Sequence, residues 1–400
     1  MPDNASLGAA KTAKNDEFYT QYSDIEAEMN AYVEFNPDVF REKTILLPCD
    51  DPEWSNFTKY FAANFERFGL KKLISTSYAK GAGNHQITMF EMLSPLYDET
   101  KHQAHGKLFT LTRDKDGSGN IDTDDIEFSG YLEGDGDFRS EEVTKLRDEA
   151  DIIITNPPFS LFREFLAWIM EGKKQFIIIG RKDAVTYKEL FPLLRDNVLW
   201  LGPVFPNGNA YFRIASKNVR AFADGVYNEK AGLVKFRNVG WFTNVDHCAR
   251  HKSLILDTMA HNLKYNRRLI KKLTNDYSSS VYPIIDNYDA LEVPFVECIP
   301  SDYDGLMAVP TTFLDQYNPE QFAIIGITKT WNGLATKLYD KQHQVDKDGK
   351  RSLVTKLNDG AAIIVDRCPS NKTFYTIGET IYVQTYPRIL IRPKKGGLPI

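Results

Sequence analysis

Between residue 15 and about residue 255, short apolar segments alternate with longer stretches whose apolar side chains recur at helical spacing. Segments 44–47, 72–76, 151–155, 175–180 and 198–201 are predicted to be buried strands. Helices are predicted at 55–68, which Gly69 would end, at 160–170 and at 186–195. Such alternation is typical of crossover units and predicts an α/β fold with a mostly parallel sheet. Because ligands bind these sheets at the carboxyl ends of the strands, the loops after strands are the first places to look for chemistry.

From about residue 256 this alternation is lost. The remaining sequence opens with a basic stretch, passes through aspartate- and tyrosine-rich loops, and ends in strand-like segments at 361–365, 374–377 and 389–392. The first fourteen residues are small and polar. We therefore expect three parts, which are a mobile arm at 1–14, an α/β domain at 15–255 and a second region at 256–400.

Composition narrows the class of protein. The chain is 42% hydrophobic and can build a large core, yet it has no apolar run of about eighteen residues that would span a membrane. The N-terminal residues lack the apolar core of a signal peptide. The four cysteines, Cys49, Cys248, Cys298 and Cys368, are far apart and unpaired in the sequence. This spacing argues against a zinc site or a disulfide framework and predicts a cytoplasmic protein.

Two stretches in the last third are locally basic although the formal net charge is −5. Residues 261–275 hold Lys264, Arg267, Arg268, Lys271 and Lys272 without an acid, and residues 381–395 hold Arg388, Arg392, Lys394 and Lys395. A nucleic acid responds to the local field of such a patch rather than to the net charge. Charge runs are more often solvated faces than binding surfaces, so composition alone does not favour a DNA-binding protein.

The strongest chemical signal is Asn156-Pro157-Pro158-Phe159, which follows a predicted buried strand and precedes a predicted helix. The prolines stiffen the loop and leave its carbonyls free. The Asn156 side-chain oxygen and a proline carbonyl can then accept from one –NH₂ group, as an exocyclic amine requires when it attacks a methyl group. Phe159 offers a face on which an extruded base can stack. The alternative is an ordinary Pro-Pro turn, which the position after a buried strand disfavours.

With these residues in place, the chain resembles the EcoRI-type adenine-specific DNA methyltransferases. The similarity runs through most of the chain in the order of the family. Its motifs are NDEFYTQ at 15–21, CDDP at 49–52 with SNF at 55–57, GDGDFRS at 134–140, TNPPFSLF at 155–162, WFTN at 241–244, VPTTFL at 309–314, NPEQF at 318–322 and RILI at 388–391.

The resemblance implies a Rossmann-like methyltransferase domain at 15–255, S-adenosylmethionine as donor, and a duplex DNA substrate bound by a target-recognition region at 256–400. Asn156, Pro157, Pro158 and Phe159 would be catalytic. The implied cofactor-binding residues are Phe18, Tyr19, Thr20, Cys49, Asp50, Asp51, Asn56, Asp135, Asp137 and Phe138, and the expected DNA-binding residues are Lys264, Arg267, Arg268, Lys271, Lys272 and Arg388. The resemblance is also compatible with a cognate restriction endonuclease acting on the same site.

The sequence departs from the usual pattern of adenine methyltransferases in two loops. The first strand is followed by Asp50-Asp51-Pro52 without a glycine, and no acid follows the second strand, where residues 75–78 read STSY. Asp50 and Asp51 can alternatively complement the dipole of the helix that begins nearby. Asp135 and Asp137 can alternatively be turn residues that bond their own backbone.

Residues 114–125 match the loop of an EF-hand, with oxygen ligands at the expected positions and glycine at the sixth. The last position is Asp125 instead of glutamate, and the preceding segment is strand-like instead of helical. An acidic hairpin tip explains the pattern as well, and adenine methylation needs no metal, so we expect no catalytic metal.

Three other activities remain compatible with the residues. A cytosine N4-methyltransferase acts on another exocyclic amine, and a glutamine-modifying protein methyltransferase shares a similar Asn-Pro-Pro-aromatic loop. The third is a binding protein for DNA or calcium that retains an inactive methyltransferase fold.

Overall fold

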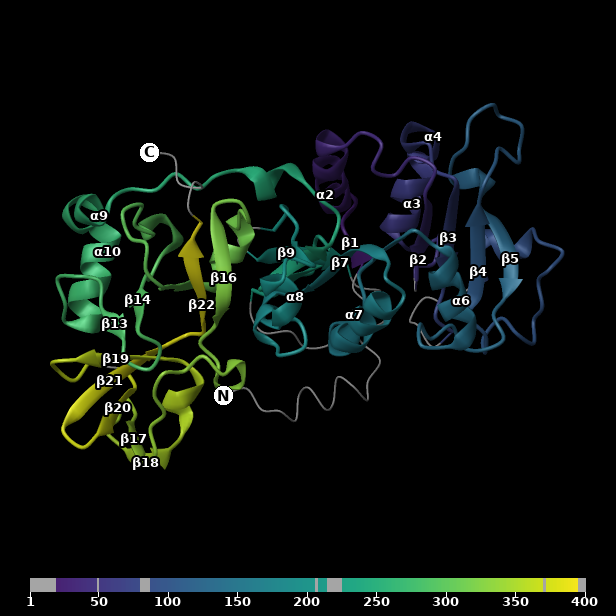
Figure 1. Cartoon of the computed structure of the whole chain (residues 1–400). Helices are drawn as coiled ribbons and strands as arrows, with labels where there is room; N and C mark the ends of the chain where they lie inside the picture. Colours follow the sequence, from purple (N-terminus) through teal and green to yellow (C-terminus); the bar gives the residue numbers. More distant parts are fainter. Residues whose placement is uncertain are drawn as a thin grey trace. The chain divides into compact units, whose positions relative to one another are not determined.

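The computed structural model describes residues 19–48, 50–79, 87–205, 208–213, 225–369 and 372–394, and the expected arm at 1–14 lies outside them (Figure 1). The protein is a mixed α/β protein with large sheets and divides into two compact units. Unit 1 comprises 1–183 and 199–248, and unit 2 comprises 184–198 and 249–400. None of the described helices is long and apolar enough to cross a membrane. The described cysteines, Cys248, Cys298 and Cys368, form no disulfide.

Unit 1 is built on an eight-stranded sheet with the order β5-β4-β3-β2-β6-β7-β12-β8. The strands are β2 (Thr44–Leu47), β3 (Lys72–Thr76), β4 (Lys107–Leu111), β5 (Glu127–Tyr131), β6 (Ile152–Thr155), β7 (Gln175–Arg181), β8 (Trp200–Leu201) and β12 (Val239–Thr243). Only the central strands β3, β2, β6 and β7 are parallel neighbours. The parallel part of the sheet has fewer strands than predicted, because β4 follows β3 in the chain but pairs with it antiparallel.

Helices cover both faces of this sheet. They are α2 (Tyr22–Phe35), α3 (Asn56–Ala63), α4 (Phe65–Phe68), α5 (Met89–Met92), α6 (Glu141–Glu149) and α7 (Phe162–Glu171). On one face, α2 and α3 share a core with alternate residues of the strands, such as Ile45 and Leu47. On the other face, Phe162 at the start of α7 packs against Phe242 of β12 with ring centroids 5.0 Å apart. The central strands are therefore buried on both sides, as their uninterrupted apolar sequences predict.

Two predicted helices differ in the structure. The predicted helix at 55–68 is divided at Asn64 into α3 and α4, and it ends at Gly69 with a left-handed φ of 61°. The predicted helix at 186–195 shortens to α8 (Phe191–Arg195), because Pro192 fits only the first turn of a helix. The predicted strand at 198–201 shortens to β8.

A second sheet in unit 1 has the order β1-β9-β11-β10 and is antiparallel throughout. Its strands are β1 (Tyr19–Thr20), β9 (Asn209–Arg213), β10 (Tyr227–Asn228) and β11 (Leu233–Arg237). The N-terminal strand β1 is thus held by a hairpin about 190 residues further along the chain, since Thr20 pairs with Phe212.

Unit 2 contains a ten-stranded sheet with the order β16-β22-β15-β14-β13-β19-β21-β20-β17-β18. Its strands are β13 (Ile284–Ile285), β14 (Ala290–Glu292), β15 (Met307–Pro310), β16 (Phe322–Ile327), β17 (Gln342–Val345), β18 (Arg351–Val354), β19 (Ala361–Val365), β20 (Phe374–Ile377), β21 (Thr380–Thr385) and β22 (Arg388–Pro393). Besides α8, the unit has the helices α9 (Met259–Tyr265) and α10 (Arg267–Lys272) and the π-helix Leu273–Tyr277. The strands predicted in the last third are confirmed.

A buried acid joins helix α2 to the loop after β8. Glu28 is fully buried, and its carboxylate accepts from the Tyr32 hydroxyl at 2.7 Å and from the Val204 N–H at 2.9 Å. Gly202 leaves the space for it, because a Cβ there would lie 1.9 Å from Glu28 Oε1. Burial raises the pKa of Glu28 to about 8.

We expect Glu28→Gln to reduce the pH dependence of stability. Because the folded-state pKa lies near 8 and the ordinary value is 4.5, the wild-type protein loses stability as the pH rises between them, by at most about 1.4 kcal/mol per pH unit. Glutamine does not ionise, and it can accept from Val204 while it donates to Tyr32. Thermal unfolding between about pH 5 and about pH 9 should therefore show a smaller fall in Tm than in the wild type. The control is Glu34→Gln, at an exposed position of the same helix, and a fall equal to wild type in Glu28→Gln would contradict the assignment.

Candidate active site

The carboxyl edge of the parallel strands is organised by Asp50, which follows β2 and is buried. Its Oδ1 accepts from the Ser55 hydroxyl at 2.7 Å, and its Oδ2 accepts from the Thr155 hydroxyl at 2.6 Å. The backbone carbonyl of Asp50 accepts from the hydroxyls of Thr58 and Ser75. Asp50 therefore connects α3, the end of β3 and the end of β6. This network, rather than exposure to a ligand, is the role that the structure gives to a residue expected to bind the cofactor.

Two adjacent carboxyl groups at this edge have raised pKa values. Burial raises the pKa of Asp50 to about 7, although the hydrogen bonds from Thr155 and Ser55 oppose the shift. Burial also raises the pKa of Asp51 to about 6, against the Glu53 N–H and the charge of Lys107. Asp51 is half-buried and accepts one hydrogen bond at 2.9 Å, from that N–H. Of the two acids, Asp51 is the less buried residue.

The Asn-Pro-Pro loop begins directly after Thr155. The Asn156 side-chain oxygen is buried, Pro157 is buried, and Pro158 is half-buried. The 3-10 helix Phe159–Leu161 starts at once, with the Leu161 N–H donating to the Pro158 carbonyl at 2.9 Å. Pro157 and Pro158 have no N–H group, so neither can donate a hydrogen bond to the Asn156 side-chain oxygen. The loop is therefore stiff, and Thr155, the residue before it, is anchored to Asp50.

Phe159, which directly follows the two prolines, lies against the small sheet. Its ring makes edge-to-face contacts with Phe212 of β9 and Phe236 of β11, with centroids 6.3 and 5.9 Å apart. The ring is half-buried. The small sheet thus positions Phe159, and part of the ring remains accessible for stacking.

The predicted N-terminal cofactor element reaches the same edge. Asn56, the first residue of α3, donates its side-chain amide to the Thr20 carbonyl at 2.7 Å. Among the described residues, the buried hydroxyl of Thr20 has no hydrogen-bond partner. Tyr19 is half-buried beside it on β1. An orphaned hydroxyl in this element fits a polar group of a bound cofactor. The predicted residues Phe18 and Cys49 lie outside the described residues.

The predicted loop at 134–140 packs against the end of β3. The Asp135 carbonyl accepts from the Ala79 N–H at 2.7 Å. Gly136 has a left-handed φ of 82°, and a Cβ there would lie 2.3 Å from the Ser77 carbonyl oxygen. Asp135 therefore stays a cofactor candidate, held at the carboxyl edge by this close approach.

Two other residues of this loop have different roles from those predicted. Asp137 is bound by the guanidinium of Arg139 at 2.6 and 2.9 Å, so its charge is already neutralised. Phe138 is buried and packs against Phe165 and Trp168 of α7, with centroids 5.0 and 5.6 Å apart. Phe138 thus packs in the core and holds the loop on α7, and its predicted role in cofactor binding stays a prediction.

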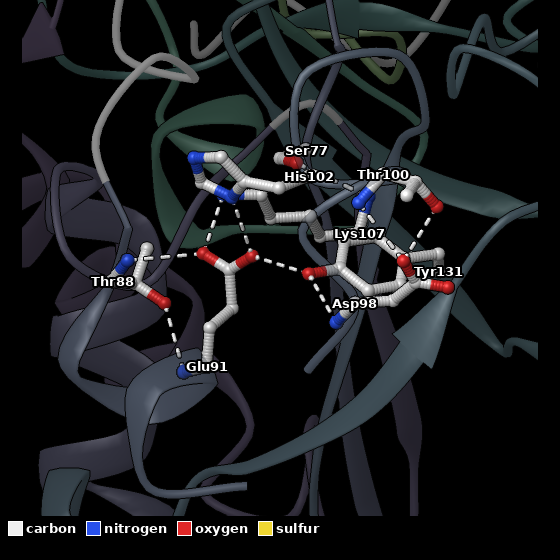
Figure 2. Close-up of polar contacts among 8 residues, drawn as sticks. All are labelled: Ser77, Thr88, Glu91, Asp98, Thr100, His102, Lys107 and Tyr131. Atoms are coloured by element: carbon white, nitrogen blue, oxygen red, sulfur yellow. Dashed lines mark hydrogen bonds and ion pairs between the residues drawn. The ribbon is translucent and has the colours of Figure 1, made fainter. Parts of the chain in front are cut away.

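A buried cluster of charged residues lies where β4 enters the sheet (Figure 2). Glu91 Oε2 accepts from Lys107 Nζ at 2.5 Å and from the Thr88 N–H at 3.0 Å. Glu91 Oε1 contacts His102 Nδ1 at 2.9 Å and accepts from the Tyr131 hydroxyl at 3.0 Å. Sequence reasoning missed this cluster. The spacing of Thr88 and Glu91 is that of a helix capping box, a signal that can locate the start of α5 but not the burial of its acid.

The EF-hand-like loop brings Asp114, Asp116 and Asp125 together, with ligand atoms within 4.8 Å of one another. The buried Asp125 carboxylate accepts backbone N–H groups of Lys115, Asp116 and Asp122 at 2.7 to 3.2 Å. These bonds close the loop on itself as an acidic hairpin tip.

The six residues predicted to bind DNA fall into three groups. Lys264, Arg267 and Lys271 are exposed along α9 and α10. Arg268 and Lys272 form ion pairs with Glu297 and Asp276. Arg388 is buried and holds the fully buried Glu292 with both Nε and Nη2, at 3.1 and 2.7 Å. The Arg388 guanidinium is therefore held inside the unit by Glu292, and its predicted contact with DNA stays a prediction.

Comparison with known proteins places these features in a family. The sequence model of the family described as adenine-specific methyltransferase EcoRI matches residues 6–394. The Type II methyltransferase M.EcoRI of Escherichia coli is 38% identical over 330 residues, which are 82% of this chain and 90% of the relative. The Type II methyltransferase M.MpnI of Mycoplasma pneumoniae is 32% identical over 359 residues, or 86% of this chain and 95% of the relative. No protein of known structure matches the chain.

We expect Thr155→Val to destabilise unit 1 by about 1–3 kcal/mol, because it leaves a buried carboxyl oxygen of Asp50 without its donor. The loss should be larger at about pH 8.5 than at about pH 5.5, since Asp50 ionises near pH 7 and an unpaired charge costs more to bury than a neutral acid. Denaturant unfolding at the two pH values measures both effects. Thr155→Ser is the control, because it keeps the hydroxyl; an equal loss in Thr155→Ser would show that the methyl group, not the hydrogen bond, matters.

Proposed function

The chain belongs to the EcoRI family of adenine-specific methyltransferases and methylates adenine in DNA, and we propose that S-adenosylmethionine is its methyl donor and Asn156 its principal catalytic residue. The supporting observation is the 2.6 Å hydrogen bond from Thr155 to Asp50, which ties the Asn-Pro-Pro loop to the loop after β2. The four parallel strands with helices on both faces are the arrangement expected of a Rossmann-like methyltransferase domain. The family is specific for adenine, which decides against the cytosine and protein alternatives.

The catalytic loop acts on the amino group of the target base. Asn156 and the Pro157 carbonyl accept its two hydrogens, which fixes the direction of the nitrogen lone pair. Because the target nitrogen is unreachable inside a duplex, the adenine is flipped out, and the accessible part of Phe159 stacks on it. Positioning carries the rate, since reactants held in line avoid most of the entropy cost of a bimolecular step.

The donor site is formed by β1 and by the loops after β2 and before α6. Asp51 is placed to bind the positively charged amino group of the donor, and the orphaned hydroxyl of Thr20 is available to a polar group next to it. Tyr19 and Asn56 shape the same wall, and Asp135 is available to the donor's adenine. When bound, S-adenosylmethionine supplies an electrophilic methyl group on a sulfonium.

Unit 2 is the proposed DNA-recognition region, and the exposed cations Lys264, Arg267 and Lys271 are its phosphate contacts. Bound phosphates replace counterions around the duplex, so these contacts supply affinity without reading sequence. Type II methyltransferases belong to restriction–modification systems; a cognate endonuclease with the same target and a cytoplasmic location are part of this proposal.

Asn156→Ala should abolish methyl transfer while S-adenosylmethionine still binds, because Asn156 contacts the target amine and not the donor. Nucleoside mass spectrometry on unmethylated duplex DNA measures N6-methyladenine, and calorimetry measures donor binding. Asn64→Ala, which removes an asparagine side chain from the α3–α4 junction of the same unit, is the control and should remain active. Near wild-type turnover by Asn156→Ala would refute the role, and 4-methylcytosine as the product would refute the adenine target.

The double variant Arg267→Ala/Lys271→Ala should weaken DNA binding and flatten its salt dependence. Each lost phosphate contact lowers the slope of log K against log salt by about 0.9, so the pair should lower it by roughly 2. Fluorescence anisotropy with a labelled duplex at several salt concentrations measures the slope. Lys347→Ala/Lys350→Ala removes two exposed lysines from the β17–β18 turn of the same unit and serves as the matched control. Equal slopes in the two double variants would contradict the assignment of α9 and α10.

A further inference from the structure

Unit 2 contains an open pocket of about 380 Å³ between the π-helix Leu273–Tyr277, the end of β21 and the start of β22. Its volume lies within the range of small-ligand sites. Turns of π-helix are uncommon and often occur at functional sites. The side chains that matter for its chemistry are those of Lys272, Asp276, Lys372, Gln384, Tyr386 and Arg388. The pocket is therefore a candidate binding site built from residues that the active edge of unit 1 does not use.

Two ammonium groups of the pocket converge on one carboxylate. Lys272 Nζ donates to Asp276 Oδ2, and Lys372 Nζ donates to Asp276 Oδ1. Burial raises the pKa of Asp276, but the hydrogen bonds from the two lysines outweigh it and leave the pKa below its ordinary value. The carboxylate is therefore charged, and it offsets only one of the two ammonium groups. Because the Lys372 side chain is 56% exposed, the remaining positive charge is open to an anion from solvent.

A further cation lies on the same π-helix. The exposed Arg367 donates from Nε to the hydroxyl of Ser278, the residue that ends the π-helix, at 2.9 Å. Its Nη2 donates to the Thr274 carbonyl at 3.3 Å. Three cations thus contact this short helix and its cap, against the one acid Asp276, and the surface around the pocket favours a polyanion.

The lining groups that can read a base are engaged inside the protein. Glu292 holds the Arg388 guanidinium at 3.1 and 2.7 Å. The Gln384 amide accepts from the Tyr375 hydroxyl at 3.0 Å and donates to the Lys356 carbonyl at 2.5 Å. Arginine and glutamine are the side chains that recognise guanine and adenine with paired hydrogen bonds. With both occupied, the pocket presents lysine and hydroxyl groups, which contact phosphates and sugars.

Tyr386 adds an uncovered aromatic ring to the wall of the pocket. The residue is 88% exposed and directly follows β21. Tyrosine suits a binding surface because its ring is apolar and its hydroxyl tolerates water. In a duplex the base faces are stacked inside, whereas the sugars lie on the outside beside the phosphates. A ring at the edge of a phosphate site therefore meets deoxyribose.

We propose that this pocket binds one backbone phosphate of the DNA substrate between Lys272 and Lys372, with the neighbouring deoxyribose packed against Tyr386. The inference rests on the proposed role of unit 2 in DNA recognition and adds a backbone contact to those of α9 and α10. Asp276 keeps the two ammonium groups together, so an arriving phosphate meets cations that are already in place. Such a contact fixes the register of the duplex without reading its sequence.

The test uses duplexes that carry the target sequence, as identified by mapping N6-methyladenine, and one uncharged methylphosphonate at each backbone position in turn. Fluorescence anisotropy measures the affinity. At about 0.1 M salt, neutralising the phosphate held by the pocket should weaken wild-type binding by roughly 5- to 10-fold. Lys372→Ala should weaken binding of the unmodified duplex by a similar factor. In this variant the methylphosphonate at that one position should cost little more, whereas the other positions keep their full cost.

Lys347→Ala, at an exposed position of the β17–β18 turn, is the matched control and should keep the wild-type dependence on position. Tyr386→Ala should weaken binding, whereas Tyr386→Phe should not, because the ring makes the contact. Lys372 and Tyr386 are both exposed, so these variants leave the fold intact.

A loss in Lys372→Ala that adds to that of the methylphosphonate at every position would show an action through general charge alone and would overturn the proposal, as would unchanged affinity. If the wild type binds no duplex, the role of unit 2 in DNA recognition fails. If Arg267→Ala/Lys271→Ala weakens binding and Lys372→Ala does not, only the pocket assignment fails.

Discussion

The hydrogen bond between Thr155 and the buried carboxyl of Asp50 is the constraint on which the active edge of this protein depends. It joins the end of β6 to the loop after β2, and Ser55 and Ser75 extend the same network to α3 and β3. The bond between Thr155 and Asp50 brings together segments that are about a hundred residues apart in the chain. Because the Asn-Pro-Pro loop starts at the next residue, its position is inherited from this network. The position of the Asn-Pro-Pro loop is thus set by Asp50, which lies in a different loop.

Three buried glutamates of the described structure join segments that are apart in the chain. Glu28 holds the loop after β8 to α2, Glu91 with Lys107 holds the segment between β3 and β4, and Glu292 with Arg388 joins β14 to β22 in unit 2. In each case hydrogen bonds satisfy the carboxyl group, which is the condition under which a buried polar or charged group is tolerated. Such groups contribute little net stability but specify one arrangement, since a shifted register would leave a charge unpaired. The expected consequence is that parts of the fold respond to pH more strongly than its surface charges suggest.

Predicted site residues that lie at strand ends are close together in the structure. Two residues predicted from a motif and from a charge run instead have side chains directed into the protein. Asp50 and Thr155 meet because the parallel strands β2 and β6 end at the same edge, and the Asn56 amide links α3 there to Thr20 of the small sheet. Phe138 and Arg388 were assigned from a motif and from a charge run, and both side chains point into the protein. A motif gives the place of a residue in the chain, whereas neighbours such as Phe165 or Glu292 decide whether its side chain faces a ligand.

The sequence by itself determined the alternation of strands and helices in unit 1, the buried strand before Asn156, the strands of the last third and the family of the chain. These features are local or repeat along the chain, so spacing and motif identify them. Only the tertiary structure decided that β4 runs against β3, that 184–198 joins unit 2, and that Lys107 lies buried beside Glu91. Each depends on contacts between residues far apart in sequence, and a lysine at the start of a strand looks the same in the sequence whether it faces solvent or a buried carboxylate. The physical reason is that burial and ion pairing arise only when the chain is folded, whereas the periodicity of apolar residues is present in the sequence itself.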